Sequence, residues 1–170
     1  MISMFAGWIA LLLFAGCTIY AGLNDVATMT IRNRLVLALA VGYFVLAPAT
    51  GISPDVMVSS AAAAAAMLAC TFALFAFAWI GGGDAKLSAV AVLWLGPDLA
   101  VTYILYASVF GLLLTLALLQ YRRMPLPVFL QGMEWPGRLH TPGAGVPYGA
   151  ALALAGLLLL PESHWLAAIV

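Results

Sequence analysis

Charged residues are scarce in this sequence. Only 7% of its 170 residues are Asp, Glu, Lys or Arg, whereas 66% are hydrophobic. A soluble domain usually carries about 25% charged residues. The shortage of charge excludes a soluble globular chain, and the apolar excess indicates an integral membrane protein.

Cysteine is also scarce, which excludes several kinds of site. Cys17 and Cys70 lie inside apolar runs, with no CxxC pair and no cluster of cysteine and histidine nearby. Zinc sites and disulfide frameworks need clustered or paired ligands. We interpret both cysteines as small core residues and predict no metal site and no cofactor. The six basic and six acidic residues balance, so net charge indicates no nucleic-acid partner.

Apolar residues are grouped into six runs separated by polar residues. The runs are 4–23, 35–52, 56–80, 87–95, 99–120 and 147–161. A helix needs about 20 mostly apolar residues to cross a bilayer, and the fourth run has only half that length. The N-terminus lacks a basic region with a cleavage site, so the first run is expected to be a retained span. We predict an all-α membrane protein with six transmembrane helices, a short fourth helix and one domain, residues 1–170.

All the basic residues fall in connections that six crossings would place on one side. They are Arg32, Arg34, Lys86, Arg122, Arg123 and Arg138. Connections rich in Lys and Arg face the cytoplasm, so both termini are expected outside (N-out/C-out). The long cytoplasmic connection, residues 121–146, contains four prolines, which exclude one long helix. Because it is also rich in apolar residues, including Val128 and Phe129, we expect an interfacial loop lying on the lipid headgroups.

A polar segment, Gly-Gly-Gly-Asp-Ala-Lys-Leu at residues 81–87, follows the third run. Its glycines allow backbone conformations closed to other residues and let another main chain approach closely. Asp84 precedes the fourth run, which predicts that it is the N-cap of the next helix. The simplest interpretation is a glycine turn with a capping aspartate. For Lys86, an anchor that extends to the membrane surface is a simpler interpretation than a catalytic role.

Asp25 ends the first run, and the predicted topology puts it at the depth of Asp84. Two carboxylates within a few ångströms share a proton, so one acts as a base on water while the other donates to a peptide carbonyl. This is aspartic-protease chemistry; the alternative is two ordinary interfacial acids. Because Asp84 would begin one helix and Asp25 would follow the end of another, we assign Asp84 as the base and Asp25 as the acid.

The segment Gly81-x-Gly83-Asp84, followed by Lys86, resembles the GxGD signature of the type IV prepilin peptidases. These are aspartic proteases of the membrane with six helices. The resemblance implies that Asp84 is catalytic and that Gly81, Gly83 and Lys86 form a supporting motif.

Two further segments extend the resemblance. Asp25, with Ile31 and Asn33 downstream, is similar to the family's first catalytic aspartate and its Ile-Pro-Asn element, although Arg32 occupies the proline position. The Pro-Tyr-Gly sequence at 147–149 is similar to a motif of the short CpaA/TadV-like branch found in Tad/Flp pilus systems.

The resemblance implies an endopeptidase of the bacterial inner membrane. Its substrate would be a Flp-like prepilin, cleaved after a glycine to release a basic leader at the cytoplasmic face. Long members of the family carry a CxxC domain and also methylate the new N-terminus; without that domain, we expect cleavage only. The alternative is a non-enzymatic small transporter, channel or assembly subunit whose acids carry protons or ions. Transport sites usually lie near the midplane, whereas both candidate acids are placed at the interface.

Overall fold

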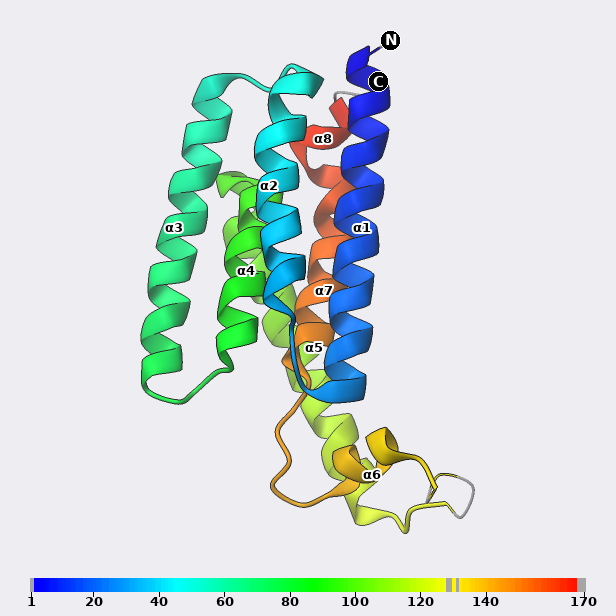
Figure 1. The fold of residues 1–170 in the computed structure, drawn as a ribbon. Coiled ribbons are helices and arrows are strands. Elements are labelled where there is room, and N and C mark those ends of the chain that lie inside the picture. The colour runs from blue at the N-terminus through cyan, green and yellow to red at the C-terminus, as the bar shows by residue number, and fades with distance from the viewer. Residues whose placement is uncertain (1, 128–129, 131, 168–170) are drawn as a thin grey trace.

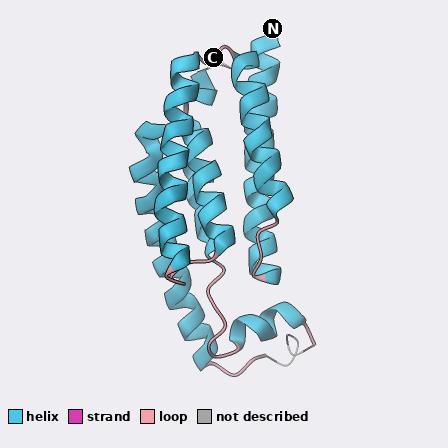
Figure 2. Ribbon diagram, turned by 60° about the vertical axis from the view of Figure 1, so that its left-hand side comes forward, coloured by secondary structure: helices cyan, strands magenta, loops and turns pink. Residues whose placement is uncertain are grey.

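The computed structural model describes residues 2–127, 130 and 132–167, and the regular elements of that part of the chain are all helical (Figures 1 and 2). The prediction of an all-α protein is confirmed. The elements are α1 (Ile2–Thr28), α2 (Asn33–Thr50), α3 (Pro54–Ala76), α4 (Gly82–Leu95), α5 (Pro97–Arg123), α6 (Glu134–His140), α7 (Tyr148–Leu159), a 3-10 turn (Leu160–Glu162) and α8 (His164–Ala167).

Four of the described helices, α1, α2, α3 and α5, are long and apolar enough to cross a membrane. Helix α4 has 14 residues and α7 has 12. At about 1.5 Å per residue, both are shorter than the roughly 30 Å hydrocarbon layer of a bilayer. The structure therefore confirms four helices of spanning length, and the other two predicted spans, at α4 and α7, stay a prediction.

Glycine and proline residues define where the helices end and begin in the two turns on the side of the bundle away from α6. Gly51 ends α2 in the left-handed conformation, with φ of 84°. The Ser53 side chain then accepts a hydrogen bond from the Val56 backbone N–H, and Pro54 occupies the first turn of α3. Gly96, with φ of 86°, separates α4 from α5, which begins at Pro97. These residues satisfy or replace backbone groups that a helix end leaves free, which explains the sharp turns.

Helix α4 lies at the centre of the bundle. Every residue from Leu87 to Leu95 is buried, and α4 packs against α2, α3, α5 and α7. The Trp94 indole N–H donates to the Leu39 carbonyl over 2.9 Å. The Trp165 indole N–H donates to the Trp94 carbonyl over 2.8 Å, and the two rings stack. Trp165 of α8 therefore covers the carbonyl end of α4, so this short helix ends inside protein.

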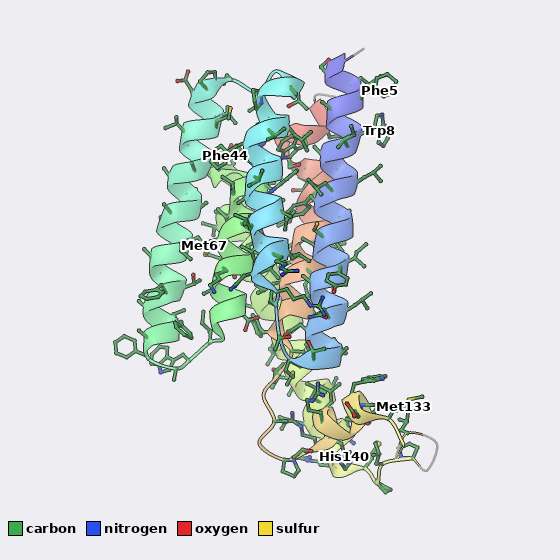
Figure 3. The ribbon with its side chains drawn as sticks, in the orientation of Figure 1. Phe5, Trp8, Phe44, Met67, Met133 and His140 are labelled. Atoms are coloured by element: carbon green, nitrogen blue, oxygen red, sulfur yellow. The ribbon has the colours of Figure 1, made fainter. Side chains whose placement is uncertain are left out.

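The outer surface of the bundle is apolar. Phe5, Trp8 and Phe44 extend outward from α1 and α2 (Figure 3) and are 50% to 61% exposed. Water would make such a surface costly, whereas lipid would not. Together with the four spanning-length helices, this surface indicates a multi-pass membrane protein.

Both chain ends lie at one end of the bundle, and α6 lies at the other (Figure 1). The connection predicted as an interfacial loop, residues 121–146, is partly helical, because α5 continues to Arg123 and α6 forms around a buried Pro136. Val128 and Phe129 lie outside the described residues. Met133 and Trp135 are about half exposed, which agrees with a segment at the membrane surface.

Candidate active site

Asp25 lies in the last turn of α1, which continues to Thr28. The expected helix end at Leu23 was therefore wrong by about one turn, because two polar residues do not by themselves end a helix. The Asp25 side chain is buried, with 5% exposure. Its Oδ2 accepts a hydrogen bond of 2.8 Å from the backbone N–H of Gly149, in the first turn of α7. This hydrogen bond joins the end of α1 to the start of α7.

Asp84 lies in the first turn of α4. The prediction that Asp84 is the N-cap of this helix was therefore wrong. The N-cap is Gly81, which has an extended backbone. The Asp84 carboxylate accepts a hydrogen bond from the Gly81 backbone N–H. An acid in the first turn that bonds back to the N-cap N–H is the second half of a capping box. The carboxylate is therefore held at the helix N-terminus, where the backbone dipoles stabilise a negative charge.

The three glycines are needed for close packing and not for unusual backbone angles. None of Gly81, Gly82 and Gly83 has a positive φ; the residue that does in this turn is Ala78, with φ of 58°. A Cβ added at Gly83 would lie 3.0 Å from the Ile31 Cβ, and one at Gly82 would lie 3.2 Å from the Phe75 ring. The prediction of a close approach is confirmed, and this approach seats the start of α4 against the turn that follows α1.

The structure brings Asp25 and Asp84 to the same place. Both line a cavity of about 260 Å³ whose other walls are residues 29–31 and 81–83. Both also line a larger cavity of about 850 Å³, which we call the aspartate cavity. The charge of Asp25 acts on Asp84. Among the described residues, no group of three His, Cys, Asp or Glu side chains is arranged to hold a metal ion.

Asp25 and Asp84 have similar surroundings. The helix-dipole argument that assigned Asp84 as the base and Asp25 as the acid therefore no longer holds. The sequence placed Asp25 against the carbonyl end of α1 only. In the structure it also accepts the Gly149 N–H at the start of α7, just as Asp84 accepts the Gly81 N–H at the start of α4. Helix dipoles therefore favour a charge on either carboxylate, and they do not select Asp84 as the base.

Two arginines hold the far wall of the aspartate cavity in place. Arg122 of α5 donates to the carbonyls of Leu139, Ala144 and Gly145 over 2.8, 2.6 and 2.9 Å. Arg138 of α6 donates to the Ala27 carbonyl over 2.6 Å and lines the cavity itself. In the sequence, both residues were interpreted only as charges that set orientation. Their acceptors are main-chain carbonyls, which no sequence pattern identifies.

Lys86 faces away from both aspartates. Residues two apart on a helix are separated by about 200°, so Asp84 and Lys86 point to opposite sides. The Lys86 ammonium donates to the Asn33 side-chain carbonyl over 3.0 Å, on the exposed surface. It lines neither cavity that contains the aspartates. Lys86 and Asn33 therefore join the starts of α4 and α2.

Replacing Lys86 with alanine should lower kcat/KM for the reaction of this site less than about tenfold, because an exposed hydrogen bond contributes only about 0.5–1.5 kcal/mol. Asn33→Ala should have the same effect, and the double variant should be no worse than either single one. The measurement is a double-mutant cycle with purified protein. A loss near a hundredfold for Lys86→Ala, in a protein that remains folded, would show that the ammonium takes part in the chemistry.

The comparison with known families agrees with this geometry. Residues 12–116 match the type IV leader peptidase family, and this range includes both Asp25 and Asp84. The match covers more than half of the 170 residues. No curated protein and no solved structure matches the chain.

Proposed function

We propose, from the premise that this chain belongs to the type IV leader peptidase family, that it is a membrane-embedded aspartic endopeptidase. Its substrates would be type IV, Flp-like prepilins, from which it removes a basic leader peptide. The observation that carries the proposal is the position of Asp25 and Asp84 on one cavity.

The chemistry requires one carboxylate to be charged and the other protonated. The charged carboxylate takes a proton from a water molecule as the water oxygen attacks the peptide carbonyl carbon. The protonated carboxylate donates its proton to the carbonyl oxygen, which gives a neutral tetrahedral intermediate. The carboxyl group that took the water proton then donates it to the leaving nitrogen, while the other carboxylate takes back a proton from a hydroxyl of the intermediate. The C–N bond breaks, and both carboxyl groups return to their starting states. The Gly149 and Gly81 N–H groups orient the two carboxylates.

We place this site at the cytoplasmic face of the bacterial inner membrane, in a chain with six crossings and both termini outside. The end of the bundle that holds the aspartates is opposite the chain ends (Figure 1). The basic residues of the connections belong to that same end, as the positive-inside bias requires. Helices α4 and α7 would complete the passage because protein covers much of their surface.

The substrate follows from this location. A precursor with a basic leader and an apolar stem would leave its leader in the cytoplasm and its stem in the bilayer, so its scissile bond would reach the aspartates. We assign the chain to the short CpaA/TadV-like branch because of the Pro-Tyr-Gly sequence at 147–149. Gly149 of that sequence contacts Asp25 directly.

The test is cleavage by the purified protein in detergent. A Flp-like prepilin should be cut at a single bond after its glycine, as shown by the masses of the leader and the mature protein. A precursor with a bulky residue in place of that glycine serves as the control and should remain intact. Absence of cleavage, combined with proton or ion flux when the protein is placed in vesicles, would instead support the transporter or channel interpretation.

A further inference from the structure

A third cavity, of about 250 Å³, lies beside the aspartate cavity and is lined by residues of α3, α4, α5 and α7. We call it the side cavity. Met67, on the face of α3 toward α4 (Figure 3), lines it. Its other walls include Leu74, Ile104 and Leu152. Two of its hydroxyls are already bonded: Thr71 donates to the Met67 carbonyl and Ser88 to the Asp84 carbonyl, both over 2.7 Å. The Tyr103 hydroxyl, which also lines the cavity, is buried and has no hydrogen-bond partner among the described residues. The other walls are mainly apolar, so the side cavity is suited to a large apolar group, with this one hydroxyl facing it.

The side cavity continues into the aspartate cavity. Ile80, Asp84 and Tyr148 line both. If a peptide bond reacts beside Asp84, the substrate chain on one side of that bond would consequently lie in the aspartate cavity, and the chain on its other side would lie in the side cavity. The two flanks differ in character, because Arg138 and the 144–146 segment line the aspartate cavity, whereas the side cavity is mainly apolar.

The side cavity also opens toward the surface of the bundle. Cys70 of α3 and Ser108 of α5 line it, and both are exposed. The interpretation of Cys70 as a core residue was therefore wrong, because an apolar run in a membrane protein also supplies residues that face outward. Around them the surface is apolar and would face lipid. A chain that lies in the bilayer can therefore insert a side chain between α3 and α5 without leaving the lipid.

We propose that the side cavity binds the first apolar side chain of the substrate stem, on the mature side of the scissile bond. This inference rests on the proposed function. The volume is smaller than the roughly 300 Å³ at which ligand pockets begin, and it therefore suits one large side chain better than a separate small molecule. Its continuity with Asp84 places that side chain next to the reacting bond. The side cavity would thus select precursors by the size of one residue.

The first test narrows the mouth of the side cavity. Ser108→Trp should raise KM about tenfold for a precursor with leucine at the first stem position. The indole would occupy part of the space for the leucine side chain, and a mismatch of even one methylene group in an apolar pocket changes affinity about tenfold or more. For a precursor with alanine there, KM should change less than twofold. Val109→Trp, at a half-exposed position that does not line the cavity, is the matched control and should leave both KM values unchanged. An equal effect of Ser108→Trp on both precursors would overturn the inference.

The second test uses the native thiol and needs no bulky substitution. In a Cys17→Ala, Asp25→Asn protein, which should bind the precursor without cutting it, the precursor should slow modification of Cys70 by a small methanethiosulfonate at least about tenfold. The leader peptide alone should not slow it. If the wild-type protein cleaves the precursor but Cys70 reacts at an unchanged rate, this inference fails while the proposed function stands. If the wild-type protein does not cleave, both fail.

Discussion

Replacing either Asp25 or Asp84 with asparagine is expected to reduce leader cleavage by about 10²–10⁴-fold, the contribution of a positioned acid or base. Asparagine has nearly the same shape as aspartate but cannot exchange a proton with water or substrate. Its side-chain carbonyl can still accept the Gly149 or Gly81 N–H that each aspartate accepts now. The variants should therefore stay folded, and the measurement is the initial rate of mature pilin formation, followed by mass, together with circular dichroism.

Asp55 and Asp98 provide matched controls for this prediction. Each is an exposed aspartate in the first turn of a helix, and neither lines a cavity that contains Asp25 and Asp84. Asp55→Asn and Asp98→Asn should cleave within about twofold of the wild type, since surface substitutions away from the site have small effects. Near wild-type cleavage by Asp25→Asn or Asp84→Asn would refute the two-carboxylate mechanism.

Gly149→Ala is expected to lower kcat about a hundredfold, because a displacement of about 1 Å in a catalytic group has this effect. The added Cβ would lie 2.9 Å from the Asp25 Oδ2 and 2.9 Å from the Ile31 Cδ1. The Ile31 Cδ1 ends a flexible side chain and can rotate away, but the Asp25 Cβ also lies 3.0 Å from the added methyl group, so Asp25 cannot give way without moving from the Gly149 N–H. The loss should appear in kcat more than in KM, because the substitution changes the orientation of the carboxylate and adds nothing to the side cavity.

The control for the added methyl group is Gly16→Ala. Gly16 lies in α1, and a Cβ there would have no neighbour within 4 Å. Alanine at that position should raise helix stability by up to about 1 kcal/mol and leave cleavage unchanged. Thermal unfolding of both variants separates a stability effect from an effect on the reaction. Equal kcat values for Gly149→Ala and the wild type would mean that this N–H does not orient Asp25.

The sequence was sufficient to predict the long helices and to place Asp25 and Asp84 close together, which the shared cavity bears out. The catalytic role of the two aspartates stays a prediction. Long apolar runs predict α1, α2, α3 and α5, and the polar segment at 81–87 marks the start of α4. The ends were less predictable: α1 continues past Asp25 because Asn24 and Asp25 fit a helix as well as a turn. Likewise, Asp84 lies within the first turn of α4 because Gly81, three residues earlier, is the N-cap.

Contacts between distant residues could not be predicted from one sequence. The Gly149–Asp25 bond joins residues 124 positions apart. Arg122 and Arg138 donate to the backbone carbonyls of Ala144 and Ala27. Because every residue has such a carbonyl, the sequence does not identify these acceptors. The hydrogen bond from Lys86 to Asn33 joins residues 53 positions apart, and no local pattern indicates it. The side cavity, formed by four helices, has no pattern of its own.

The hydrogen bond from Gly149 to Asp25 also determines when, during synthesis of the chain, the site can become active. Chains emerge from the ribosome N-terminus first, so Asp25 and Asp84 are both in the membrane before α7 has been made. Until α7 docks, Asp25 has neither the Gly149 N–H nor the helix N-terminus that holds its charge. A nascent chain thus carries both carboxylates before Asp25 is aligned, and the site is completed only when α7 packs against α1.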